Sequence, residues 1–256
     1  MNFEKIGAPI AVLQNKPDPS KNKILYVHAD KEDVVNYIKD FKSPSKEQTF
    51  QQIPNITTER QILYVTGASG SGKSYFTKAF TDQYKKIYPK REVYLFSSIA
   101  DDSSIDKVKN LKRIKLTPEF LVGEISVQDF KDSLVIFDDT DVISDKKMNL
   151  KVTGILNAIL ETGRHYNVSC IYTSHVACDG RNTKKILNEA HSITIFPTGL
   201  GGRSLKYLLQ DYLGFDKEQI KRIKRLESRW VSILKTYPMM VLSEKEAYTL
   251  NLDDDK

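Results

Sequence analysis

One eight-residue segment limits the possible folds of this chain more than any other. GASGSGKS, residues 67–74, has the spacing G-x-x-x-x-G-K-S and lies between the apolar run ILYVT and the helix-like segment YFTKAFTDQYKKIY. Glycines at such a turn let successive backbone N–H groups face a phosphate chain, and the helix N-terminus adds a favourable dipole. The sequence therefore predicts a nucleotide-binding loop made of Gly67, Ala68, Ser69, Gly70, Ser71, Gly72, Lys73 and Ser74.

Two side chains at the end of this loop have predicted roles of their own. Lys73 can reach the β and γ phosphates of a nucleoside triphosphate, and the hydroxyl of Ser74 can bind magnesium. We therefore expect ATP and Mg²⁺ as cofactors, with Lys73 as a catalytic residue and Ser74 as a metal ligand.

A second apolar run, SLVIF, ends in two carboxylates, Asp138 and Asp139. A buried strand that ends in this way places them at the C-terminal edge of the sheet, where the phosphate loop also opens. Asp138 is predicted to hold the magnesium ion, and Asp139 to orient or deprotonate the attacking water. An Asp pair that merely begins a turn is the alternative.

Short β-rich runs recur after residue 61 and alternate with segments long enough for helices. The runs are ILYVT, EVYLFS, SLVIFD, SCIYTSH and SITIFP, and the helices are predicted at 73–88, 147–162, 182–190, 203–213 and 217–227. This alternation predicts an α/β fold with a mainly parallel central sheet flanked by helices. Together with the phosphate loop, the two strands that follow the acidic strand favour a P-loop NTPase of the RecA/ASCE type. Gly163 is expected to end the second helix in a left-handed conformation.

The chain divides into three predicted parts. Residues 1–60 mix one possible strand, KILYVHA, with Pro-containing polar stretches, and form an N-terminal extension whose role the residues do not indicate. Residues 61–215 form the ATPase core. Residues 216–256 supply a basic helix and a C-terminal hairpin packed on the core, with an acidic end, LDDDK, that is expected to fray.

The run SCIYTSH ends in three polar residues, Thr173, Ser174 and His175, which an apolar core strand would not need. In motor-type P-loop ATPases a strand of this kind lies between the loop strand and the acidic strand, and its polar tip senses the γ phosphate. His175 or Ser174 is the predicted sensor. A His175 that only caps a loop is the alternative.

The composition excludes several classes of protein. A net charge of +6 is compatible with a polyanionic partner, although many basic proteins bind no nucleic acid. The apolar stretches fall far short of the roughly 20 residues that cross a bilayer, so we expect no membrane span and no secretion. Two cysteines, Cys170 and Cys178, fit a reducing compartment, and the lack of zinc-type Cys/His spacing predicts no structural metal.

Three segments resemble the DNA-packaging ATPases of nucleocytoplasmic large DNA viruses and their virophage relatives, in the FtsK/HerA superfamily. They are FDDTDVISDKK, ILETGRHYNVSCIYTSH and RNTKKILNEAHSITIFP, and the resemblance covers about residues 61–242 but not the first 60. Two departures stand out, because many members have Glu in place of Asp139 and often Gln in place of His175.

The resemblance implies a homo-oligomeric ring, a pentamer or hexamer, that couples ATP hydrolysis to pulling double-stranded DNA into a preformed capsid. Capsid portal or vertex proteins would be its partners. The expected location is the host-cell cytoplasm or viral factory, with a transient stage at the virion.

Ring motors of this kind also use an arginine to neutralise charge on the transferring phosphoryl group. Arg164, in the matched GRH, is the candidate that acts on the neighbouring subunit; stabilising the C-terminus of its own helix is the alternative. Arg203, after GLGG, is the candidate that senses the nucleotide within its own subunit.

The segment DKEQIKRIKRLESRW is the predicted DNA-contacting helix, through Lys221, Lys224 and Arg225. Translocation favours sequence-independent contacts with phosphates, which such side chains can make. A solvated helix face is the alternative. The loops GLGGR and ACDGRNTKK could line a pore instead.

Three other functions stay open. A small-molecule kinase shares the phosphate loop but normally has its acidic strand next to the loop strand. A non-catalytic binding module does not require the intact set Lys73, Ser74, Asp138 and Asp139. A DNA helicase or replication-associated P-loop ATPase is the main rival, since it uses the same phosphate chemistry.

Overall fold

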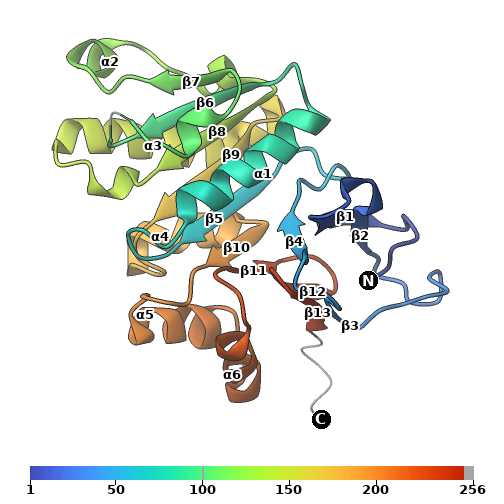
Figure 1. Cartoon of the computed structure of the whole chain (residues 1–256). Coiled ribbons are helices and arrows are strands. Elements are labelled where there is room, and N and C mark those ends of the chain that lie inside the picture. The colour runs from blue at the N-terminus through green and yellow to red at the C-terminus, as the bar shows by residue number, and fades with distance from the viewer. Residues whose placement is uncertain (100, 251–256) are drawn as a thin grey trace.

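A ten-stranded sheet forms the centre of the molecule, with strand order β3-β13-β12-β11-β10-β5-β9-β8-β6-β7 (Figure 1). The computed structural model describes residues 1–99 and 101–250, so the predicted acidic end, LDDDK, lies outside the described residues. The parallel part comprises β5 (Ile62–Thr66), β6 (Glu92–Ser97), β7 (Leu111–Ile114), β8 (Ser133–Asp138), β9 (Ser169–Ser174) and β10 (Ser192–Ile195). The predicted α/β class and the five predicted strands are confirmed.

Helices cover both faces of the parallel part. They are α1 (Lys73–Ile87), α2 (Pro118–Val122), α3 (Lys146–Thr162), α4 (Gly180–Glu189), α5 (Gly202–Lys206), continued by a π-helical turn at Tyr207–Tyr212, and α6 (Lys217–Arg225). Short 3₁₀ turns lie at Pro19–Lys21, Ile105–Lys107, Val127–Phe130, Thr140–Val142 and Gly163–Tyr166. Within residues 1–99 and 101–250, every helix is too short or too polar to cross a bilayer.

Strand β5 shows how the sequence produces this layering. All five of its residues are buried, which is the pattern of a parallel strand covered on both faces. Ile62 and Tyr64 pack with the residues of α3, α4 and α6, whereas Leu63 and Val65 pack with α1. Alternate side chains of one strand therefore belong to two separate cores.

The C-terminal part contains the predicted hairpin and extends it by one strand. Strands β11 (Val231–Leu234), β12 (Met239–Ser243) and β13 (Glu246–Leu250) form an antiparallel meander, and β11 pairs with β10, so the meander continues the sheet of the core. Strand β3 (Asp40–Lys42) pairs with β13 and ends the sheet. The pairing of β11 with β10 satisfies backbone groups of β10 that would be unpaired if β10 were an exposed edge strand.

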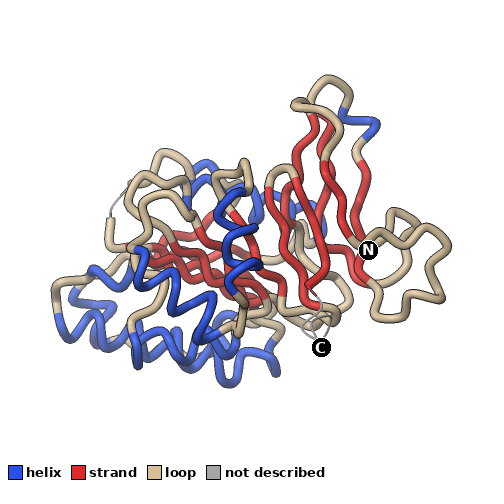
Figure 2. Tube along the Cα trace, turned by 90° about the horizontal axis from the view of Figure 1, so that it is seen from below, coloured by secondary structure: helices blue, strands red, loops and turns tan. Residues whose placement is uncertain are grey.

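The N-terminal extension contains a second sheet, with the order β2-β1-β4. The predicted strand is confirmed as β2 (Lys23–Val27), whereas β1 (Ala8–Asn15) and β4 (Gln48–Gln52) were not predicted. Leu13, Leu25 and Phe50 pack into the same core as α1, and the N–H of Phe50 donates to the carbonyl of Glu244 in the C-terminal meander (2.8 Å). Figure 2 shows these strands beside the antiparallel part, while the helices gather around the parallel part. The extension is thus built into the fold.

Helix α3 ends in a different way from the one predicted for Gly163. This residue has φ −59°, and the left-handed residue is Asn167, with φ +54°. The buried guanidinium of Arg60 donates to two of the last four helical carbonyls, those of Ile159 (2.7 Å) and Leu160 (2.8 Å). These bonds stabilise the end of the helix without a left-handed glycine.

His191 makes the stability of this fold pH-dependent. The N–H of Ile62 donates to its Nδ1 (3.0 Å), and burial together with the charges of Arg60 and Lys235 lowers its pKa. The unfolded chain takes up this proton near pH 6.5 while the folded chain resists it. The free energy of unfolding must therefore fall as the pH drops from about 6.5 towards the lower folded pKa.

We expect His191→Gln, whose amide oxygen can still accept this bond without titrating, to reduce that loss between pH 7.5 and 5.5 by at most about 1.4 kcal/mol, the linkage value of the one pH unit below 6.5. Urea unfolding at pH 7.5 and 5.5 measures the change in the free energy of unfolding, with His28→Gln as control. If wild type and His191→Gln lose the same free energy of unfolding between these two pH values, His191 is not the group responsible.

Candidate active site

The nucleotide-binding loop joins β5 to α1. Gly70 and Gly72 have φ +72° and +108°, a region that side chains rarely adopt. At Gly67 the constraint is contact instead, since a Cβ there would lie 2.7 Å from the Cβ of Phe196, just after β10. Phe196 thus supports the loop from the neighbouring strand, and glycine is required at these three positions for two different reasons.

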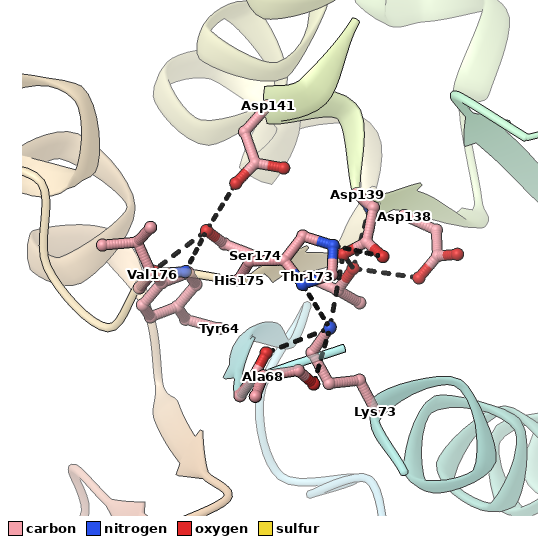
Figure 3. Close-up of polar contacts among 11 residues, drawn as sticks. Tyr64, Ala68, Lys73, Asp138, Asp139, Asp141, Thr173, Ser174, His175 and Val176 are labelled. Atoms are coloured by element: carbon pink, nitrogen blue, oxygen red, sulfur yellow. Dashed lines mark hydrogen bonds and ion pairs between the residues drawn. The ribbon is translucent and has the colours of Figure 1, made fainter. Parts of the chain in front are cut away.

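Lys73 lies at the mouth of the loop and is only 5% exposed. Its ammonium donates to the carbonyl of Gly67 (3.1 Å) and to Nδ1 of His175 (3.2 Å), and it lies 3.6 Å from Oδ1 of Asp139 (Figure 3). A buried ammonium requires such partners. Phosphate oxygens can compete for them, because charge-assisted hydrogen bonds to an ammonium are strong.

Both aspartates lie at the end of β8, as predicted. Burial raises the pKa of Asp138 to about 6, and the negative charge of Asp139 adds to this effect. The hydroxyl of Thr173 on β9 lies 2.9 Å from Oδ1 of Asp138 and 3.1 Å from Oδ1 of Asp139, within reach to donate to either. Asp139 has a left-handed backbone, with φ +48°. The carboxylate of Asp139 contacts Lys73. Asp138 is only 1% exposed.

His175 connects the loop lysine with the second aspartate. Its Nε2 lies 3.0 Å from Oδ2 of Asp139, and its Nδ1 faces Lys73. The neutral tautomer with the proton on Nε2 satisfies both contacts, and we assign it on that basis. Ser174, the other predicted sensor, donates instead to Oδ2 of Asp141 (2.7 Å). Of the two candidates, only His175 contacts the predicted catalytic groups.

The strand order agrees with the predicted class. Strand β9 lies between the loop strand β5 and the acidic strand β8, and β10 flanks β5 on its other side. A kinase of the type considered above has its acidic strand directly beside the loop strand. The topology therefore does not match that alternative.

The two candidate arginines lie at opposite ends of the parallel strands, Arg203 after the end of β10 and Arg164 before the start of β9. Arg203 is exposed near the start of α5, after a loop whose Gly199 would place a Cβ 3.1 Å from the Cβ of Ala68, so this loop touches the nucleotide-binding loop of its own chain. Arg164 precedes β9, whereas the nucleotide-binding loop follows the parallel strand β5. The side chain of Arg164 is 71% exposed, and its Nε lies 2.6 Å from Oε2 of Glu59. A strand length of roughly 16 Å separates Arg164 from its own phosphate site.

The donors at the site fit magnesium. Ser74 lies in the first turn of α1 and Asp138 at the end of β8, and within the described ranges there is no cluster of three or more His, Cys, Asp or Glu side chains that could hold a metal. Mg²⁺ typically takes one or two carboxylates, substrate phosphates and several waters rather than an all-protein cage. The raised pKa of Asp138 indicates a buried carboxylate that a cation would stabilise in its charged form.

Sequence reasoning missed Asp102, in the loop that follows β6. Its Oδ1 accepts the N–H groups of Ser104 (2.7 Å) and Ile105 (2.8 Å). Burial acts in the opposite direction, but these bonds and the hydroxyl of Ser74 hold the pKa of Asp102 below its usual value. Its position after β6 could have indicated it, because β6 is parallel to β8 and both strands end on the side of the sheet where Asp138 lies.

The fold and the arrangement of the site define a P-loop ATPase in which one strand separates the loop strand from the acidic strand. The chain belongs to the family of protein V3 of Sputnik virophage, to which it is 35% identical over 253 residues, 98% of either chain. The resemblance to virophage proteins is thereby confirmed. The chain matches no family model.

Solved structures share the fold at low sequence identity. The genome packaging NTPase B204 of Sulfolobus turreted icosahedral virus 2, in complex with ATPγS, has a TM-score of 0.52 and 16% identity, over 73% of this chain and 98% of that one. The cytoplasmic domain of the type VII secretion ATPase EccC of Thermomonospora curvata has a TM-score of 0.52 and 11% identity, over 86% of this chain and 29% of that one. At these identities the likeness establishes the fold.

Proposed function

We propose that this chain is an ATP-driven motor that moves double-stranded viral DNA into a preformed capsid. The observation that carries the proposal is the contact of Lys73, Asp139 and His175 at the edge of a sheet with motor-type strand order. Membership of a virophage family and a fold shared with a viral genome packaging NTPase support it.

The three contacting residues divide the chemistry of hydrolysis between them. Lys73 binds the β and γ phosphates and thereby turns away from Asp139. The freed carboxylate orients the attacking water and accepts its proton. His175 contacts both groups, so it registers whether the γ phosphate is present. Mg²⁺, held by Ser74 and Asp138, would neutralise charge on the phosphate oxygens when bound.

The basic helix α6 supplies the proposed DNA contacts. Arg222 anchors this helix, with an Nη2 that lies 2.5 Å from Oδ2 of Asp40 and a guanidinium 3.5 Å from the centre of the Tyr248 ring. The predicted contacts Lys221, Lys224 and Arg225 are exposed on the same helix. The helix is thus fixed by one arginine and presents other cations to solvent, as phosphate binding requires.

We also propose the assembly implied by this function. Subunits form a ring of five or six copies around DNA, and the ring docks on portal or vertex proteins of the capsid in the host cytoplasm or viral factory. Arg164 acts on the nucleotide of the neighbouring subunit and Arg203 on that of its own, which agrees with their opposite positions along the strands.

Steady-state ATP hydrolysis without DNA, with single-stranded DNA and with long duplex DNA, at fixed low salt, tests the function. We expect the duplex to stimulate most strongly and its effect to fall steeply with salt, because phosphate contacts release counterions. Preference for single strands would indicate a helicase instead. Indifference to both, with transfer to a small phosphate acceptor, would indicate a kinase.

A charge-reversal variant shows whether α6 makes the DNA contact. Lys221→Glu, Lys224→Glu and Arg225→Glu together should abolish duplex stimulation and leave hydrolysis without DNA at the wild-type rate. The matched control reverses three exposed lysines elsewhere, Lys21, Lys23 and Lys31, with the same change in net charge. Equal loss of stimulation in both variants would mean that overall charge, not α6, governs DNA binding.

A further inference from the structure

A cavity of about 130 Å³ opens directly beside the nucleotide-binding loop. Its walls come from three parts of the chain: the loop and the start of α1, the N-terminal sheet, and the strand ends near β10 and β11. The residues that matter most are Ser71 and Tyr75 from the first part, Gln14 and Gln51 from the second, and Phe196 and Trp230 from the third. Strand β4 packs against both α1 and β12, which brings the N-terminal sheet to this position (Figure 1).

The chemistry of the walls fits a flat heterocycle. Five aromatic rings line the cavity. Four are buried, those of Phe50, Phe76, Phe196 and Trp230, and Tyr75 is 65% exposed at its mouth. Gln51 is buried, and its Nε2 donates to the carbonyl of Gln52 (3.1 Å). That bond uses one hydrogen, so the amide retains an acceptor oxygen and a second N–H for a ligand.

The position of the cavity indicates what enters it. Ser71 and Gly72 belong both to the nucleotide-binding loop and to the cavity wall, and Tyr75 directly follows the phosphate-binding residues. The hydroxyl of Ser71 is shielded from solvent and has no hydrogen-bond partner within the described part of the chain. A group attached to a phosphate chain on this loop would therefore extend past Ser71 and enter the cavity. The volume is several times the roughly 30 Å³ of one water molecule.

We propose that this cavity binds the adenine base of the nucleotide whose phosphates the loop holds, so that the N-terminal sheet takes part in nucleotide recognition. The proposal rests on the proposed nucleotide binding. Aromatic side chains stack on bases, and a glutamine amide matches the paired donor and acceptor of adenine. Gln51 and Gln14 therefore select ATP over GTP, and Tyr75 covers the base.

Equilibrium binding of ATP, GTP and inorganic tripolyphosphate tests the assignment. Tyr75→Ala and Gln51→Ala should each weaken ATP binding about 10-fold, consistent with the loss of one stacked base or one bidentate pair. Both should leave tripolyphosphate binding unchanged, and Gln51→Ala should also reduce the preference for ATP over GTP. Tyr237→Ala, an 84% exposed tyrosine beyond the far end of β11, serves as the control.

The single tryptophan of the chain provides a second readout in the wild-type protein. Trp230 lies in the cavity wall, so ATP should change its fluorescence and tripolyphosphate should change it much less. Because Tyr75 is exposed, its variant tests the proposal even if Gln51→Ala fails to fold.

The possible failures are distinguishable. If both cavity variants bind ATP like wild type, or lose ATP and tripolyphosphate binding equally, the assignment of the base site is wrong, while the assignment of the phosphate loop stands. If Lys73→Ala still binds tripolyphosphate like wild type, the proposed function fails.

Discussion

Replacing Asp139 by asparagine is expected to lower the turnover number for ATP by about 10²- to 10⁴-fold, the usual contribution of a general base, while ATP still binds. Asparagine has the same shape and tolerates the left-handed backbone found here, φ +48°. It can also keep the hydrogen bond from its own N–H to Oγ1 of Thr173 (2.9 Å). What it cannot do is accept the proton of the attacking water.

Single-turnover hydrolysis and equilibrium ATP binding separate these two effects for Asp139→Asn. The control is Asp141→Asn, the same change two residues later, where the carboxylate accepts a hydrogen bond from Ser174 and does not contact Lys73. We expect the control to keep turnover close to wild type. Turnover of Asp139→Asn within a few-fold of wild type would show that another group accepts the proton.

Arg164→Ala is expected to lower turnover by about 10³-fold or more in the proposed ring, at nearly constant ATP affinity. The present partner of this guanidinium is Glu59, and both side chains are more than half exposed. Water screens an exposed ion pair of this kind, so in the proposed ring Arg164 can exchange Glu59 for a phosphate of the neighbouring subunit at little cost.

Mixed assemblies identify which subunit Arg164 serves. An Arg164→Ala subunit keeps its own Lys73 and Asp139, and a neighbouring Asp139→Asn subunit still supplies an arginine. Mixing the two variants should therefore restore activity at some subunit boundaries. Arg203→Ala mixed with Asp139→Asn should restore none, because both defects then lie in sites that each subunit completes by itself. Absence of rescue in the first mixture would exclude action of Arg164 across the boundary.

The sequence predicted the parts of the site that depend on short stretches of chain. Lys73 and Ser74 follow from one local motif, and the alternation of β-rich runs with helical segments placed β8 and β9 correctly. Aspartate has a shorter reach than the glutamate that many superfamily members have at this position. The left-handed backbone of Asp139 brings its carboxylate to Lys73 and His175.

The parts that the sequence did not predict depend on contacts between distant residues. Strand β4 reads QTFQQ, with one apolar residue, and Gln51 and Phe50 acquire their positions from α1 and the C-terminal meander. Asp102 follows a strand that is remote in sequence from β8, and their proximity appears only when the sheet is assembled. The ending of α3 was mispredicted for the same reason, because Arg60, about 100 residues earlier, binds its last carbonyls.

The pairing of β3 with β13 joins the N-terminal extension to the C-terminal meander, so this part of the fold forms only when synthesis has reached β13. Thr249 donates to the carbonyl of Lys39 across 210 residues of sequence. A ribosome releases the N-terminal sheet long before β13 is synthesised, and contacts of such separation form slowly. A nascent chain can therefore carry the whole nucleotide-binding loop while Trp230 and the meander behind it are still missing. Selection of a base, as distinct from attraction of phosphates, is acquired only late in synthesis.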